Sequence, residues 1–256
     1  MSEDLTIPDP AKNFKDEFDN RIGRLTKSKA YLDYCEEVYG YRIYLFNMMD
    51  QEQLDYLFHA IPLSANDTIL DLGCGSGSIL SSLVEQYGCA GVGIDQIDPD
   101  FMQKSNKSIT FINGDVDHIS DYQLKPTVTL SVDSLYFCKD LDALVRYLCS
   151  LPNNRMYLFY SQYLFDENGG DKSILQKDYT RIADILKQNS VSYEAIDFSE
   201  NERRLYEKSL IALKKREEAF THEGNSDLFS SRYREDLLGK QLYDTCRACR
   251  FLYIVK

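Results

Sequence analysis

A glycine-rich loop between a strand-like and a helix-like stretch constrains the fold of this chain most strongly. Residues 68–72 form a short, mainly apolar run, and the loop Gly73-Cys74-Gly75-Ser76-Gly77 follows it directly. A helical pattern then begins at Ser78. Glycines placed in this way let the backbone turn tightly and approach a ligand. The pattern predicts the first strand, loop and helix of a doubly wound α/β sheet, with a ligand at the loop.

Strand-like and helix-like stretches alternate through the rest of the chain, which is typical of parallel βαβ units. Strands are predicted at residues 68–72, 91–95, 109–113, 128–132, 156–160, 191–198 and 251–255. Helices are predicted at 78–86, 99–104, 118–122, 141–151 and 178–188. We therefore expect an α/β, Rossmann-like fold with a seven-stranded, mostly parallel sheet and helices on both faces.

Added segments flank this alternation. Residues 1 to about 30 show no periodicity and are expected to form a mobile arm, while helices are predicted over residues 31–39 and from Asp50, with Gln53 in a capping box. A charged helical insertion at 200–244, broken near Gly224, separates the last two strands. The predicted division is an N-terminal helical arm or lid at 1–65 and a Rossmann-like domain at 66–256 with the insertion at 200–244.

Composition limits the class of protein and its partners. The 256 residues, 43% of them hydrophobic, suffice for one domain with a sizeable core. A formal net charge of -12 repels nucleic acid, whose binding usually requires a basic patch, so nucleic acid is a disfavoured partner. No basic region with an apolar run opens the chain, and no stretch approaches the roughly 18 apolar residues of a membrane span. We expect a cytoplasmic protein that does not enter a membrane.

The seven cysteines do not indicate a disulfide framework, because their number is odd and they are spread along the chain. Cys246 and Cys249 form a lone C-x-x-C pair, and the chain offers only three histidines to complete a zinc site. We predict no metal; two cysteines near the start of a strand are the simpler interpretation.

The residues around the glycine loop indicate the type of cofactor. The dinucleotide pattern G-x-G-x-x-G requires glycine where the chain has Ser78. Asp71 lies two residues before the first glycine, where a carboxylate suits a ligand amine and repels a pyrophosphate. S-adenosylmethionine carries an ammonium for Asp71 and a carboxylate that suits the N–H groups at a helix start. The charge pattern therefore favours S-adenosylmethionine.

Acids follow the next strands as well. Asp95 ends the second strand, close to the distance of roughly 20 residues at which Rossmann-type sites place an acid on the ribose hydroxyls. Asp115 follows the third strand, where it could accept a hydrogen bond from an adenine amino group. Each acid alone is as typical of a helix N-cap or a solvated loop, but their shared position at strand ends favours a binding site.

These residues resemble the class I S-adenosylmethionine-dependent methyltransferase superfamily, in particular its small-molecule type. The resemblance covers roughly residues 66–165 and rests on Asp71 to Gly77, Gly93-Ile94-Asp95, Asn113-Gly114-Asp115-Val116 and Val132-Asp133-Ser134-Leu135-Tyr136-Phe137. The predicted cofactor-binding residues are Asp71, Gly73, Cys74, Gly75, Gly77, Asp95, Gln96, Asp115, Val116, Asp133 and Ser134.

The resemblance implies a role for most of these residues. Gly73 and Gly75 would lie along the methionine and ribose, and Asp95 would bind the ribose hydroxyls. Gln96, Asp115 and Val116 would surround the adenine. Asp133 and Ser134 would lie near the methionine amine and the transferred methyl. Cys74 is interpreted as filling the space between the glycines.

The methyl acceptor is less clearly indicated, because transfer from a sulfonium needs an aligned nucleophile more than a fixed base. The run after the fourth strand lacks the two prolines of the Asn/Asp-Pro-Pro-Tyr/Phe motif found in enzymes that methylate nucleic-acid bases. Candidate acceptor-binding residues are Tyr31, Tyr34, Tyr136, Phe137, His222 and Glu223. Aromatic rings can hold a cationic amine. Helix packing is nevertheless the simpler interpretation of the N-terminal tyrosines, which include Tyr39, Tyr41 and Tyr44, and a helix-ending turn is the simpler interpretation of His222-Glu223.

The sequence therefore predicts a methyltransferase that moves the methyl group of S-adenosylmethionine to nitrogen or oxygen of a small molecule and releases S-adenosylhomocysteine. A protein or tRNA methyltransferase is one alternative. A non-catalytic regulator that binds S-adenosylmethionine is another, because no catalytic base can be named.

Overall fold

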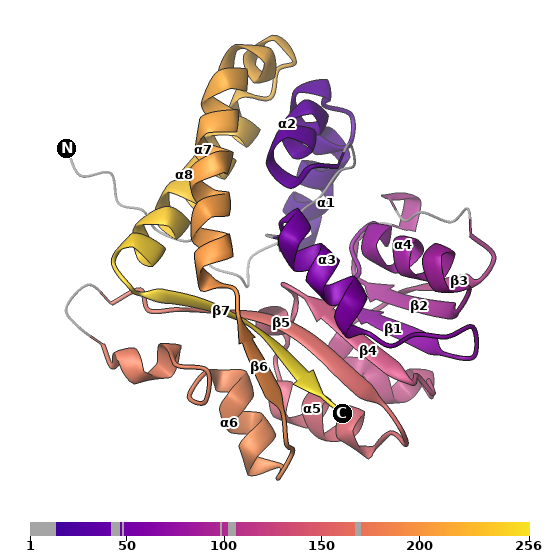
Figure 1. The fold of residues 1–256 in the computed structure, drawn as a ribbon. Coiled ribbons are helices and arrows are strands. Elements are labelled where there is room, and N and C mark those ends of the chain that lie inside the picture. Colours follow the sequence, from indigo (N-terminus) through magenta and orange to yellow (C-terminus); the bar gives the residue numbers. More distant parts are fainter. Residues whose placement is uncertain (1–13, 42–46, 48, 98, 102–105, 167–169) are drawn as a thin grey trace.

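One seven-stranded sheet organises the part of the chain that the structure describes. The computed structural model describes residues 14–41, 47, 49–97, 99–101, 106–166 and 170–256 (Figure 1). The strand order is β3-β2-β1-β4-β5-β7-β6, with β7 antiparallel to β5 and β6 and the other neighbours parallel. The strands are β1 (Thr68–Leu72), β2 (Ala90–Asp95), β3 (Ile109–Asn113), β4 (Val128–Val132), β5 (Arg155–Tyr163), β6 (Glu194–Asp197) and β7 (Ala248–Val255). The predicted Rossmann-like, mostly parallel sheet is confirmed.

Helices cover both faces of the sheet, because alternate strand residues point to opposite sides. Leu70 and Leu72 pack with α5 and α6 on one face, whereas Ile69 packs with α3 and α4 on the other. The helices are α3 (Gln51–Ala60), α4 (Ser78–Tyr87), α5 (Leu141–Ser150) and α6 (Arg181–Gln188). The 3-10 segments are η1 (Pro99–Phe101), η2 (Val116–Tyr122, with a kink at His118), η3 (Leu135–Phe137) and η4 (Lys172–Leu175).

A second group of helices, which we call the helical cap, consists of α1 (Phe14–Leu25), α2 (Lys29–Tyr39), α7 (Ser199–His222) and α8 (Ser226–Asp244). Figure 1 shows α7 and α8 side by side, extending away from the sheet, with α1 and α2 next to them. Their buried side chains form a separate apolar cluster. The predicted insertion at 200–244 is thus a helical hairpin. None of the described helices is long and apolar enough to cross a membrane.

The first helix corrects the prediction of an unstructured arm to residue 30. Residues 14–25 form α1, whose Arg21 pairs with Glu235 and whose Arg24 pairs with Asp227, both on α8. These partners lie more than 200 positions away in sequence, so local periodicity could not reveal them. Residues 1–13 of the predicted arm lie outside the described residues. The division at residue 65 stays a prediction, although α3 packs on the sheet core.

Local sequence patterns predicted the ends of the helices and strands well, with a few differences. Asp50 caps α3 and forms the predicted capping box with Gln53. Strand β7 begins at Ala248, earlier than predicted, because it pairs along the whole of β5 up to Tyr163. The predicted strand 191–198 is only the short edge strand β6. The predicted helices 99–104 and 118–122 are 3-10 turns, and residues 102–104 lie outside the described residues.

Candidate cofactor and acceptor site

The glycine loop closes tightly at the carboxyl end of β1. Its first two amides, of Gly73 and Cys74, donate to the carbonyl of Ile94 at 2.8 and 3.2 Å. Gly73, Gly75 and Gly77 all have positive φ, at 68°, 53° and 78°. A side chain at Gly73 would clash with Ser134 and one at Gly77 with the Phe111 ring, whereas nothing lies within 4 Å of a Cβ placed at Gly75. The loop is therefore packed at both ends and open at its centre.

Asp95, at the end of β2, fixes the open part of the loop. Its carboxylate accepts hydrogen bonds from the amide of Gly75 at 2.7 Å and from that of Ile97 at 2.9 Å. The side chain is half-buried, so it also borders the surface, and the neighbouring Gln96 is exposed. The structure therefore brings Asp95 to the glycine loop, as the sequence predicted; its contact with a ribose stays a prediction.

Asp71 lies buried beside the loop with an exposed fraction of only 4%. No hydrogen bond joins its carboxylate to another described residue. Burial, helped by the charge of Asp95, raises the pKa of Asp71 to about 8. A buried carboxylate without a donor is costly, so this group is suited to a cationic or hydrogen-bond-donating ligand.

Cys74 packs over the second strand rather than between the loop glycines. Its Sγ lies over β2, 2.7 Å from where a Cβ at Gly93 would stand, so only glycine fits at position 93. Burial raises the pKa of the Cys74 thiol well above its ordinary value. The thiol therefore stays protonated and is a weak nucleophile.

The end of β3 completes this edge of the sheet. Asp115 caps η2 by accepting from the amide of Asp117 at 3.0 Å, and Val116 packs against the sheet core. Asn113 donates to the carbonyl of Ile97 at 2.7 Å, which ties the ends of β2 and β3 together. Asp115 is thus at the predicted edge, with one oxygen already used as a helix cap.

The turn after β4 differs most from the predicted site. Asp133 has φ of 54°, and both its oxygens pair with Arg250 of β7, at 2.5 Å to Nη1 and 3.0 Å to Nη2. Ser134 donates to the carbonyl of Leu72 at 2.6 Å and shares a hydrogen bond with Ser131. Because the Asp133 carboxylate pairs with Arg250, the proposed site does not include Asp133 as a ligand of the methionine amine. That contact stays a prediction from the sequence.

Arg250 and Glu202, both fully buried, are site residues that sequence reasoning missed. Glu202, near the start of α7, accepts from Ser161 at 2.9 Å, from Tyr163 at 3.1 Å and from Tyr243 at 2.5 Å, and lies 3.7 Å from Arg250. Burial raises the pKa of Glu202, while Arg250 opposes that rise. We call these groups the Asp133–Arg250–Glu202 network. The sequence signal for this network is an arginine inside an otherwise apolar strand, at Cys249-Arg250-Phe251.

Exposed aromatic rings lie at the same edge. Tyr136 and Phe137 of η3 are 36% and 61% exposed with ring centres 5.2 Å apart, and Phe165, just after β5, is 51% exposed and stacks on Tyr163. The predicted candidates Tyr136 and Phe137 thus border the turn that carries Asp133 and Ser134.

The other predicted acceptor residues lie in the helical cap. Tyr31 and Tyr34 are fully buried where α2 meets α7, and Tyr34 shares a hydrogen bond of 2.5 Å with Ser209. Tyr39 is buried in the same cluster and Tyr41 packs at its border, whereas Tyr44 lies outside the described residues. These tyrosines pack helices, which was the alternative interpretation, and we leave them out of the proposed site.

His222 and Glu223 end α7 at the tip of the cap, away from the sheet (Figure 1). Glu223 accepts from the hydroxyl of Ser28 at 2.5 Å and from the amide of Ala30 at 2.9 Å, so it caps the start of α2. Gly224 then takes the left-handed conformation of a helix-ending turn, with φ of 72°. The structure does not bring this pair to the glycine loop.

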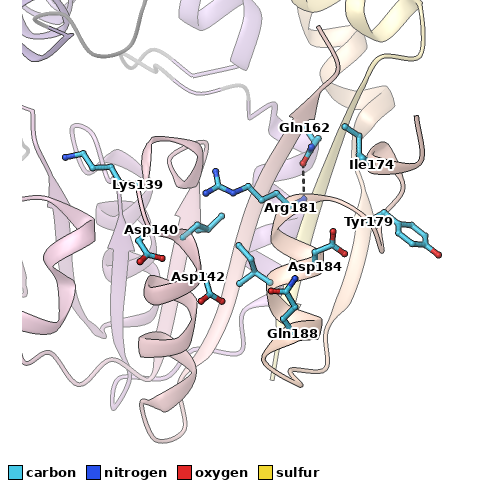
Figure 2. Close-up of a pocket in the computed structure, with 11 residues that line it drawn as sticks. Lys139, Asp140, Asp142, Gln162, Ile174, Tyr179, Arg181, Asp184 and Gln188 are labelled. Atoms are coloured by element: carbon cyan, nitrogen blue, oxygen red, sulfur yellow. Dashed lines mark hydrogen bonds between the residues drawn. The ribbon is translucent and has the colours of Figure 1, made fainter. Parts of the chain in front are cut away.

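A groove of about 460 Å³ lies between α5 and α6 (Figure 2). No residue of the glycine loop lines it. Its carboxylates already have partners, since Asp140 caps α5 and Asp142 pairs with Arg146. Gln162 likewise accepts from the amide of Arg181 at 3.0 Å.

Cys246 and Cys249 are free cysteines, one exposed and one buried. No group of three metal-binding side chains occurs among the described residues.

Residues 41–185, more than half of the chain, match the family model described as "Methyltransferase domain". The chain belongs to this methyltransferase family. The resemblance noted from the sequence is therefore confirmed, and the matched segment includes β1 to β5 but not β6 or β7. No curated protein sequence shows a significant match to this methyltransferase.

Solved structures share the fold at low sequence identity. A methyltransferase from Geobacter sulfurreducens, solved with S-adenosylhomocysteine, is 16% identical with a TM-score of 0.59, covering 88% of this chain and 97% of that one. Phosphoethanolamine N-methyltransferase 2 of Haemonchus contortus is 15% identical with a TM-score of 0.67, covering 93% and 59%. A cyclopropane synthase from Mycobacterium tuberculosis is 13% identical with a TM-score of 0.66, covering 99% and 100%. These likenesses support the fold.

Proposed function

We propose that this methyltransferase takes its methyl group from S-adenosylmethionine and transfers it to nitrogen or oxygen of a small molecule. The observation that carries the proposal is Asp71, a buried side chain whose carboxylate accepts no hydrogen bond from the described residues, beside a loop that is open at Gly75. The ammonium of S-adenosylmethionine would supply the missing cation, and its carboxylate would suit the N–H groups at the start of α4.

The remaining contacts of the donor follow from the strand ends. Asp95 lies beside Gly75. Its carboxylate accepts hydrogen bonds from two backbone amides and would accept further ones from the ribose hydroxyls with its remaining lone pairs. Gln96, Asp115 and Val116 would border the adenine. Ser134 packs against Gly73 and would lie nearest the methyl group.

The acceptor would enter at Tyr136, Phe137 and Phe165, between the sheet edge and the helical cap. Methyl transfer is an in-line displacement, so these residues need to hold the nucleophile in line with the sulfonium rather than supply a base. Aromatic rings bind amines and apolar groups well, and a net charge of -12 disfavours a nucleic-acid acceptor. The phosphoethanolamine N-methyltransferase of the same fold supports a small acceptor.

Isothermal titration with S-adenosylmethionine tests the donor. Gly75→Arg places a long side chain in the open centre of the loop and should abolish binding. Gly88→Arg is the matched control, because Gly88 also has positive φ and open space but ends α4 far from the loop. If wild type does not bind, or if Gly75→Arg binds as wild type does, the proposed donor is wrong.

The acceptor is tested separately. Wild type with S-adenosylmethionine is incubated with pooled amines and phenols, and release of S-adenosylhomocysteine is measured. Release with one pool identifies the acceptor class. Donor binding without release from any pool would refute the small-molecule acceptor and leave the donor standing.

A further inference from the structure

The turn between β4 and η3 is held in a conformation that its own residues do not favour. Asp133 adopts φ of 54°, in the left-handed region, which glycine adopts freely and which still costs aspartate free energy, although less than it costs most other residues. The next residue, Ser134, stands against Gly73 and donates to the carbonyl of Leu72. The backbone conformation at Asp133 therefore decides where Ser134 meets the glycine loop.

Arg250 supplies the contact that holds this turn. It comes from β7, separated from β4 in the sheet by β5, and its fully buried guanidinium makes a two-point pair with Asp133. The planar fork of arginine suits a carboxylate in this geometry, which a lysine ammonium cannot reproduce. Arg250 is itself fixed by a hydrogen bond of 3.0 Å to Ser161 and by the Phe159 ring, 5.1 Å from the guanidinium carbon.

The same network reaches the helical cap. Glu202 of α7 shares Ser161 with Arg250, and it accepts from Tyr163 of β5 and Tyr243 of α8. One guanidinium thus faces a partly buried carboxylate, in the turn beside the glycine loop, and a fully buried one, at the base of the cap.

We propose that Arg250 is a positioning residue for methyl transfer, which holds the Asp133 turn against the donor loop and joins that turn to the helical cap through Glu202. The inference rests on the proposed function for its effect on the donor. Arg250 is fully buried and pairs with Asp133, whose neighbour Ser134 packs against Gly73 of the loop. Its loss should therefore alter donor binding by releasing the turn.

The first test compares donor affinity by isothermal titration in folded variants. Arg250→Lys keeps the charge and loses the fork, and Arg250→Met loses both; each should weaken S-adenosylmethionine binding at least tenfold. In the double variant Asp133→Gly with Arg250→Met, glycine adopts positive φ freely, so affinity should return to within about threefold of wild type. A merely structural role predicts no such rescue.

Arg155→Met is the matched control. Arg155 pairs with Asp67 at 2.9 Å at the opposite edge of the sheet, so its loss should lower the melting temperature and change donor affinity less than twofold. Wild-type affinity in Arg250→Lys, or no recovery in the double variant, would overturn the proposal.

A second measurement does not depend on the donor. Amide hydrogen exchange at residues 73–77 should become at least tenfold faster in Arg250→Lys and return to wild type in the double variant, while Arg155→Met leaves these amides unchanged. If exchange behaves in this way and wild type fails to bind S-adenosylmethionine, the proposed function is wrong and the positioning role stands. Unchanged exchange in Arg250→Lys refutes the positioning role whatever the donor result.

Discussion

Replacing Asp71 by asparagine should change how the stability of this protein depends on pH. Burial and the charge of Asp95 raise the pKa of Asp71 from 3.8 to about 8. The unfolded chain loses this proton near pH 4, whereas the folded protein keeps it until about pH 8. Between these values the folded state binds more protons, so stability falls as pH rises. The asparagine side chain of the variant cannot ionise, and its contribution is the same at every pH.

The size of the effect follows from the two pKa values. Each pH unit inside the window costs the wild type about 1.4 kcal/mol, because one proton separates the two states. Across the whole window the cost sums to about 6 kcal/mol, which is an upper figure because solvent reaching a charged Asp71 reduces it. The free energy of unfolding of Asp71→Asn minus that of wild type should therefore rise by about 1 kcal/mol per pH unit between pH 5 and 8.

Urea unfolding of both proteins at pH 5, 6, 7 and 8 measures this difference. Asp67→Asn is the control. Burial of Asp67 opposes ionisation, but hydrogen bonds from Thr127 and Ser64 outweigh it and lower the pKa of Asp67. Asp67 is then ionised in both states above pH 5, and its removal should shift stability by a constant amount. A constant difference for Asp71→Asn as well would refute the account of the buried, unpartnered carboxylate.

Three further substitutions test other parts of the structure. Gly73→Ala forces a Cβ onto Ser134 at a φ of 68° and should lower stability by about 2 kcal/mol or more and abolish donor binding, as followed by thermal melting and titration calorimetry. Phe137→Ala removes an exposed ring and should raise the KM for the acceptor several-fold with an unchanged melting temperature, so an unchanged KM would remove this ring from the acceptor site. Glu223→Ala removes the acceptor of the Ala30 amide and the Ser28 hydroxyl at the start of α2 and should cost about 1 kcal/mol in urea unfolding without affecting donor affinity; a large loss of affinity would return Glu223 to the site.

The sequence was most informative where local chemistry decides the structure. Strands β1, β3 and β4 have the predicted limits, because each is a short apolar run bounded by turn residues. The capping box of Asp50 and Gln53 marked a helix start for the same reason. The glycine loop could be predicted too, because its glycines lie close together in sequence and the neighbouring acids end successive parallel strands.

Contacts between distant segments could not be predicted. The pairing of Asp133 with Arg250 is one example, because Arg250 lies on the last strand and only the antiparallel pairing of β7 with β5 brings the two residues together. Helix α1 was missed because its ion pairs are with α8. Tyr31 and Tyr34 pack against α7, which the sequence could not show. The same helical spacing is expected for residues that line a pocket and for residues that pack against another helix.

The place where the helical hairpin α7–α8 leaves the sheet has a consequence for how such proteins diversify. The hairpin begins just after β6 and returns at β7, and its two ends are neighbours because Asp197 pairs with Phe251. A segment that departs and returns at adjacent points can change length or be exchanged at little cost in loop-closure entropy. Under the proposed function, new acceptor preferences could therefore arise by replacing this one hairpin while the glycine loop is inherited intact. A replacement must keep an acid at the position of Glu202, because Arg250 would otherwise lose its second counter-charge.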